Sequence, residues 1–364
     1  METVRFVGLD VHKESIAIAV AEPGRGDAQV LATISNDTSL LLKRLRRLGK
    51  VKCCYEAGPT GYGLHRDLTA AGIDCVVVAP SLVPAKAGDK VKTDRRDAAR
   101  LARFLRSGDL TEIHVPDVET EAMRDLERAR DDAKKAERVA RHQLGKFLLR
   151  HGRCWPKKKS WSTKHLDWIR CQHFAQEAQQ RVLEDYLKAV EDSGARVAKL
   201  TASIVELVET WSLGPLVKAL QAMRGISVIV ATTVVAELGD LRRFESAPKL
   251  MGYLGLVPSE HSSGESRQRG RITRTGNGHA RRVLVEAAWA YRFRKAVSVD
   301  LRRRARGVAP EVQAIAWRAQ ERLCPRYRKL LARGMNKNKA VTAIARELAG
   351  FIWSIARQPK LLTA

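Results

Sequence analysis

The first hundred residues alternate short apolar runs with amphipathic stretches. Five runs have the length and the β-branched content of strands, and they cover residues 4–9, 15–21, 29–34, 51–55 and 74–78. Apolar residues with helical spacing lie at 39–48, 62–71 and 93–107. Strands and helices in this rhythm predict an α/β sheet with mixed strand directions.

The segment from 117 to 213 has helical spacing and few strand signals. Apolar residues recur there every seven positions, with leucines three positions after the last two: Leu183, Val190, Val197 and Ile204, then Leu200 and Leu207. This pattern predicts an antiparallel helical hairpin or a coiled coil. Such a region serves either as a dimerisation element or as a plain helical spacer.

The pattern changes again near residue 214 and predicts a mostly helical region. Segment 223–239 places Arg224 and Gly225 before an apolar helix, which is typical of a helix-hairpin-helix. The turn of such a hairpin presents backbone N–H groups to a DNA phosphate, although Ser227 stands where a second glycine is usual. Arg224 is therefore a candidate nucleic-acid contact. The predicted domains are 1–115, 116–213 and 214–364.

Charge narrows the choice of partner. The 66 lysines and arginines outnumber the 40 acids and give a net charge of +26. A field of this size attracts polyanions, and nucleic acid is favoured over a membrane surface because the charge is spread along the chain. We found neither a membrane-spanning run nor a signal peptide, and six cysteines without a C-x-x-C pair suit a reducing compartment. We therefore expect a cytoplasmic protein associated with the nucleoid.

Four acids occupy positions where they can converge. Asp10 and Glu56 end predicted strands, and Asp94 and Asp97 are three apart on a predicted helix. Converging carboxylates repel unless hard cations neutralise them, and Mg²⁺ or Mn²⁺ suits oxygen ligands in phosphoryl transfer. Each acid alone is more simply a loop or cap residue, but in this order they resemble a ribonuclease H-like, RuvC-like nuclease core. His12 could also reach such a metal, or be a polar turn residue.

A serine lies beside a run of arginines further along the chain. Ser263 precedes Arg267, Arg269, Arg271 and Arg274 in a glycine-rich loop. Arginines bind phosphate bidentately, and a serine can attack a phosphodiester to form a phosphoserine link. Plain phosphate binding by the loop is the simpler reading of these residues, and the adjacent Ser262 is a rival nucleophile. Lys92 can bind phosphate or merely balance the neighbouring acids.

Aromatic and basic residues are interleaved near the middle of the chain. Trp155, Trp161 and Trp168 lie among several lysines. Nucleic-acid bases can stack on such rings while lysines hold the backbone, but helical packing explains the tryptophans equally well.

Three acidic segments and a C-terminal block resemble one known family. The sequences GLDVHK at 8–13, YEAGPTG at 55–61 and KTDRRDA at 92–98 resemble the acidic blocks of the DEDD transposases of bacterial insertion sequences, a family related to Piv-type DNA invertases. The sequences GLVP at 255–258, SG at 263–264 and ITRTGN at 272–277 resemble the transposase domain of that family. The resemblance covers nearly the whole chain.

The resemblance implies a fold and a mechanism. It implies a RuvC-like domain joined through a helical hairpin to a mostly α-helical transposase domain. It also implies that Asp10, Glu56, Asp94 and Asp97 bind Mg²⁺ and that Ser263 is the nucleophile. Family members act on double-stranded donor and target DNA, use a structured bridge RNA and assemble as tetramers in which one subunit's serine completes another's metal site.

Two other functions fit the same residues. A Holliday-junction-type endonuclease would use the acids with water as the nucleophile, and it would have no need of the arginine-rich serine loop. A nucleic-acid-binding protein with an inactive nuclease fold would have no need of all four acids. We therefore expect a DNA transposase, and the junction endonuclease is the alternative.

Overall fold

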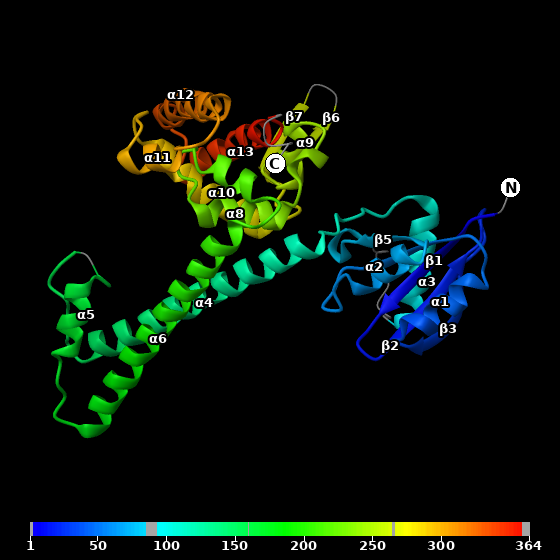
Figure 1. Ribbon diagram of the computed structural model, residues 1–364, viewed down its shortest axis with the longest axis horizontal. Coiled ribbons are helices and arrows are strands. Elements are labelled where there is room, and N and C mark those ends of the chain that lie inside the picture. The colour runs from blue at the N-terminus through cyan, green and yellow to red at the C-terminus, as the bar shows by residue number, and fades with distance from the viewer. Residues whose placement is uncertain (1–2, 85–92, 159, 264–265, 359–364) are drawn as a thin grey trace. The chain divides into compact units, whose positions relative to one another are not determined.

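The computed structural model describes residues 3–84, 93–158, 160–263 and 266–358 (Figure 1). The chain divides into two compact units, Met1–Val115 and Pro116–Ala364. Among the described residues, no helix combines the length and the apolar content that crossing a bilayer requires.

The first unit is built on a five-stranded sheet with the order β3-β2-β1-β4-β5. The strands are β1 (Arg5–Val11), β2 (Ser15–Ala21), β3 (Gln29–Ser35), β4 (Val51–Glu56) and β5 (Asp74–Val78). Strands β1, β2 and β3 pair antiparallel, whereas β4 pairs parallel with both β1 and β5. The predicted α/β sheet with mixed strand directions is confirmed.

Helices cover both faces of this sheet, and the alternation of side chains along the strands assigns the faces. Helices α1 (Thr38–Arg46) and α2 (Gly63–Ala70) pack on the face that receives Val7, Leu9 and Tyr55. Helix α3 (Asp94–Ser107) packs on the opposite face, against Ala17 and Ala19. Because successive residues of a strand point to opposite faces, Gly8, Asp10 and Glu56 belong to the face that α3 covers.

Gly8 allows α3 to lie unusually close to the sheet. A Cβ atom at this position would stand 2.2 Å from the carbonyl oxygen of Ala98 and 2.4 Å from the backbone nitrogen of Ala102. Both atoms belong to the α3 backbone, which cannot move aside as a flexible side chain would. Only glycine leaves room for this contact.

The second unit begins with a long helical hairpin. Helix α4 (Val118–Arg150) packs along α6 (Glu177–Val208), with the short α5 (Thr163–Arg170) between them in sequence (Figure 1). Leu183, Val190 and Ile204 are buried, as the seven-residue pattern predicted. Leu207 is exposed, whereas Val208 is buried. Residues three and four apart both lie near one face of a helix, and here the residue four positions after Ile204 is the one that faces the core.

The rest of the second unit is a helical cluster that shares its core with the base of the hairpin. Met123, Ile204 and Val208 of the hairpin belong to the same apolar core as the C-terminal helices. Those helices are α7 (Gly214–Leu220), α8 (Val228–Leu238), α9 (Ala247–Tyr253), α10 (Gly278–Ala288), α11 (Val299–Arg304), α12 (Pro310–Ala332) and α13 (Lys337–Ala356). One hairpin of strands, β6 (Pro258–Ser263) and β7 (Ser266–Ile272), lies among them.

Ser227, where a second glycine was expected, has a structural role at the turn between α7 and α8. Its hydroxyl accepts a hydrogen bond from the backbone N–H of Val230 and so caps α8. Gly225 has a φ of +81°, and a Cβ there would stand 2.3 Å from the carbonyl oxygen of Ala287. The turn therefore packs directly on α10.

A buried ionic cluster ties α4 to α8 and α10. His279 of α10 lies 3.5 Å from Glu237 of α8 and 3.6 Å from Glu127 of α4. Arg128 donates two hydrogen bonds to the Glu237 carboxylate, at 2.7 and 2.9 Å. Asp131 also faces His279, and it pairs with Arg282 at 2.7 Å. The Glu237 carboxylate is thus already paired with Arg128 and His279, which favours a structural role for the cluster.

We expect His279→Gln to lower the free energy of unfolding by about 2 kcal/mol at about pH 6, because it removes a partly buried charged partner of Glu237. The hydrogen bond to Glu237, together with the charges of Glu127 and Asp131, raises the pKa of His279 above its usual 6.5. Its stabilising contribution is therefore fully present below 6.5 and is lost as the pH rises through the folded-state pKa. Denaturant unfolding across this range should show the decline in the wild type and not in the variant. The matched control is His142→Gln, an exposed histidine on α4; an equal loss there would contradict the assignment.

Candidate metal centre and serine hairpin

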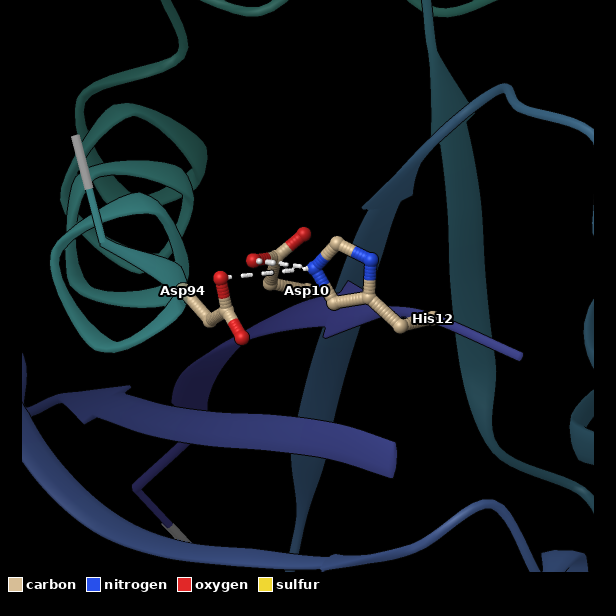
Figure 2. A group of neighbouring side chains, drawn as sticks. All are labelled: Asp10, His12 and Asp94. Carbon is tan, nitrogen blue, oxygen red and sulfur yellow. Dashed lines mark hydrogen bonds and ion pairs between the residues drawn. The ribbon is translucent and has the colours of Figure 1, made fainter. Parts of the chain in front are cut away.

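Two of the predicted metal ligands and a histidine meet where β1 ends and α3 begins. Figure 2 shows the three side chains of Asp10, His12 and Asp94 pointing toward one another. Nε2 of His12 lies 3.2 Å from Oδ2 of Asp10 and 3.5 Å from Oδ1 of Asp94. Each residue offers one ligand atom, and these atoms lie within 4.8 Å of one another. Two carboxylate oxygens and an imidazole nitrogen could hold a divalent cation.

The other two acids belong to the same face and are joined by an arginine. Nη2 of Arg100 lies 3.0 Å from Oδ1 of Asp97 and 3.8 Å from Oε1 of Glu56. Asp97 is buried and Glu56 is half-buried. The guanidinium offsets the repulsion that the two carboxylates would otherwise feel.

The local sequence explains why α3 delivers its acids here. Thr93 caps the helix by accepting a hydrogen bond from the backbone N–H of Arg96, so the first turn starts at Asp94. The contact at Gly8 holds the next part of α3, at Ala98 and Ala102, against β1. Asp94 and Asp97 fall on one side of the turn because they are three residues apart.

The electrostatics of Asp10 connect it to both helix acids. Burial raises the pKa of Asp10, and the neighbouring charges of Asp94 and Asp97 raise it further, while His12 lowers it. A raised carboxyl pKa means that the negative form is disfavoured in the folded protein. A bound cation would relieve this penalty. The exposed Asp94 side chain leaves one side of the centre open to solvent, where a phosphate could enter.

His12 and Arg100 are the residues that sequence reasoning left open or missed. His12 follows Asp10 by two positions along the strand, and that spacing was the available signal for its place on the same face. Arg100 follows Asp97 by three positions on α3, but nothing in the sequence indicates that it reaches across to Glu56. Its contact depends on how closely α3 approaches the sheet.

Ser263 is the last residue of β6 and is exposed, next to residues 264–265, which lie outside the described part of the chain. Ser262 donates a hydrogen bond to Oε1 of Glu260 at 2.9 Å. Among the residues that the structure describes, the Ser263 hydroxyl has no hydrogen-bond partner. Since neighbouring strand residues point to opposite faces, the two candidate nucleophiles face opposite sides of the hairpin.

The predicted cations near this serine have different surroundings. Arg269 lies opposite Glu260 in the ladder, with 3.5 Å between Nε and Oε2, and therefore shares the face of Ser262 rather than that of Ser263. Arg271 and Arg274 are exposed. The side chain of Arg267 lies outside the described part of the structure, as does Lys92. The expected ring of arginines around Ser263 is thus seen only in part.

Arg224 makes contacts within the protein. Its Nη1 donates hydrogen bonds to the carbonyl oxygen of Arg294, at 2.6 Å, and to Oε1 of Gln320, at 3.1 Å. The guanidinium also lies over the ring of Phe293. These contacts give Arg224 a structural role, and its contact with nucleic acid stays a prediction.

The tryptophans near the tip of the hairpin pack together. The ring of Trp168 stacks on His165, with 5.8 Å between centroids, and Trp155 lies 5.5 Å from Trp168. Arg141 lies over the ring of Trp161. Trp161 and Trp168 also pack on the local apolar core. These contacts favour the helical-packing interpretation of the tryptophans.

Comparison with known proteins gives consistent matches. Residues 7–152 match a transposase family described as DEDD transposases of the IS110 type, and residues 217–302 match the transposase family IS116/IS110/IS902. The chain is 46% identical to "Putative transposase y4qE" of Sinorhizobium fredii, over 99% of this chain and 90% of that protein. It is 31% identical to the transposase for insertion sequence element IS1533 of Leptospira borgpetersenii, over 89% of this chain and 96% of that protein.

Proposed function

Because this chain belongs to the IS116/IS110/IS902 family of transposases, we propose that it cuts and rejoins DNA at an insertion element through a phosphoserine intermediate at Ser263. Family membership makes the protein a DNA-transposition enzyme. The proposal adds the nucleophile, the metal ligands and the order of bond changes.

The convergence of Asp10, His12 and Asp94, with Asp97 and Glu56 on the same face, is the observation that carries the metal part. The donor atoms suit a hard divalent cation. Burial, and to a smaller extent the charges of Asp94 and Asp97, raise the pKa of Asp10, and a bound cation would favour its negative form. We assign Asp10, Glu56, Asp94 and Asp97 as the ligands in a RuvC-like arrangement, with His12 beside them. When bound, Mg²⁺ or Mn²⁺ would supply positive charge that stabilises a phosphate under attack.

The serine would conserve the energy of the broken phosphodiester. Its Oγ forms a bond to phosphorus as the bond from phosphorus to one deoxyribose oxygen breaks. The hydroxyl proton passes to a nearby base or to water, and the departing oxygen takes up a proton. Attack by a hydroxyl of the new DNA partner then reverses these changes, joining that strand and releasing Ser263. No external energy source is needed.

Two further features complete the proposal. A net charge of +26 attracts polyanions and is compatible with a complex that holds a structured RNA as well as DNA. We propose, as the family resemblance implies, that such an RNA pairs with donor and target DNA. We also propose a homotetramer in which the serine of one subunit acts at the metal centre of another.

Hydrolysis is the second candidate. A junction endonuclease would use the same acids with water as the nucleophile. The position of Ser263, on the face of the hairpin opposite Arg269, favours this alternative because fewer cations then lower the cost of ionising the hydroxyl. A covalent protein–DNA adduct distinguishes the two, since hydrolysis forms none.

Removal of divalent metal should abolish cleavage of a plasmid carrying the element with its flanks, because the acids then repel both one another and the phosphate. We expect EDTA to stop cleavage and added Mg²⁺ to restore it, while a gel-shift assay shows DNA binding throughout. Cleavage that persists in EDTA would overturn the metal assignment.

Treatment with ribonuclease before the same assay tests whether an RNA guides the enzyme. Undiminished, site-specific activity after this treatment would argue against a guide RNA.

A further inference from the structure

We propose that a groove between the β6–β7 hairpin and helix α13 binds the sugar-phosphate backbone of the DNA strand that is cut at the serine. The inference rests on the proposed function and adds a second wall to the predicted arginine run, formed by Lys339 and Arg346 of α13, which the sequence motifs do not indicate. The groove has a volume of about 790 Å³ and lies entirely within the second unit. Five cations line it, and we call it the basic groove: Arg269, Arg271, Arg274, Lys339 and Arg346.

The charge of the basic groove is uncompensated within the described part of the chain. Among the described residues, its lining contains no aspartate or glutamate. Only Arg269 has an ion pair among the described residues, with Glu260 outside the groove. Arg271, Arg274, Lys339 and Arg346 have none there. Cations crowded together without counter-charges repel one another, and a polyanion removes that penalty.

Neighbouring cations of the same helices show the contrast. Glu347, which follows Arg346 on α13, pairs with Arg322 and Arg326 of α12. Arg322 and Arg326 therefore stabilise the packing of α12 on α13, and their positive charge is compensated by Glu347. Arg346 is half-buried and turns toward the groove instead. Lys339 and Arg346 therefore bring charge to the groove that is not used in pairing α13 with α12.

Backbone strain fixes one of the groove arginines. Arg274 has a φ of +58°, in the left-handed region that favours glycine. Gly255 and Gly276 hold it there through close contacts: a Cβ on Gly255 would stand 2.5 Å from the backbone of Thr275, and one on Gly276 would meet the carbonyl of Tyr253. Strained positions of this kind are enriched at ligand-binding and active sites.

The groove and Ser263 belong to the same β6–β7 hairpin, although neither Ser263 nor Ser266 lines the groove. Ser266, the first residue of β7, pairs with Ser263, and Arg271 follows five residues later. Five residues of a strand span about 17 Å, which corresponds to roughly five nucleotides of one strand of a duplex. A DNA strand cut at Ser263 would therefore have its backbone beside Arg271, Lys339 and Arg346. This short distance from Ser263 is the reason for assigning the groove to DNA rather than to a separate RNA or protein ligand.

Salt dependence of binding tests the groove. The variant Lys339→Gln/Arg346→Gln removes two phosphate contacts from the far wall and leaves the serine hairpin intact. For ribonuclease-treated full-length protein and a DNA duplex from the element end, the slope of log affinity against log salt should fall by about 1.8. Between about 50 and 200 mM salt, the wild type should then lose about tenfold more affinity than the variant.

The matched control is Arg333→Gln/Lys337→Gln, two exposed cations near the start of α13 that do not line the groove. Because these two residues lie outside the groove, this control variant should keep the wild-type slope of log affinity against log salt. A groove variant indistinguishable from this control would overturn the inference. So would a reduced slope for an RNA duplex of the same sequence but not for DNA, which would assign the groove to RNA. Since slopes are measured without cleavage, this result is independent of the proposed chemistry. The single variant Lys339→Gln, at an exposed position, guards against misfolding and should lower the slope by about 0.9.

Discussion

Ser263→Ala should eliminate the covalent protein–DNA adduct and reduce strand exchange by roughly 10⁴-fold or more, the scale seen when a catalytic nucleophile is removed. The hydroxyl is the only atom lost, and it is exposed at the end of β6. The fold should therefore be unaffected. The measurement is denaturing electrophoresis of protein cross-linked to labelled DNA, together with a recombination assay.

Ser262→Ala is the matched control for this experiment. Ser262 is adjacent and exposed, but its hydroxyl is donated to Glu260 and points to the other face of the hairpin. We expect this variant to retain the adduct. If Ser262→Ala loses the adduct and Ser263→Ala keeps it, the nucleophile is Ser262. If both variants cleave DNA normally, the enzyme is a hydrolase and the phosphoserine step is wrong.

Asp10→Asn should reduce strand cleavage on the order of 10³-fold, because several kcal/mol of transition-state stabilisation depend on a metal that this carboxylate helps to hold. The same change should leave thermal stability unchanged or raise it slightly. Burial raises the pKa of Asp10, so its negative form is a cost to the fold at neutral pH, and a neutral amide of equal size removes that cost.

Opposite effects on activity and stability make the Asp10 result specific. A residue that only supports the fold would lose both together. The control is Asp27→Asn, an exposed acid in the same unit, which should change neither. Normal cleavage by Asp10→Asn would refute the metal centre, and a large fall in melting temperature would show that Asp10 stabilises the fold instead.

Side-chain alternation made much of the candidate site predictable. Asp10 and Glu56 lie at the C-terminal ends of β1 and β4, which pair side by side. Because side chains alternate between the two faces of a sheet, the sequence alone is enough to place both acids on one face. The spacing of Asp94 and Asp97 likewise requires only a helix. These inferences depend on local geometry, which the sequence specifies directly.

Contacts between distant elements were not predictable in the same way. Arg224 looked available to DNA, but its partners Arg294 and Gln320 lie 70 and 96 residues further along the chain. The basic groove depends on α13 lying beside a hairpin that ends more than sixty residues before it. Such meetings follow from the packing of the whole unit, and no short motif signals them.

The close approach at Gly8 has a consequence for how this enzyme can vary. Two of the four acids reach the centre only because one strand residue has no side chain, so the geometry of the centre is set by contact between two backbones. A methyl group at that position would displace the start of α3 and disperse the acids while every acid stayed chemically intact. Inspection of the four carboxylates alone would then classify an inactive copy of the element as active, and the glycine is the position that reveals the difference.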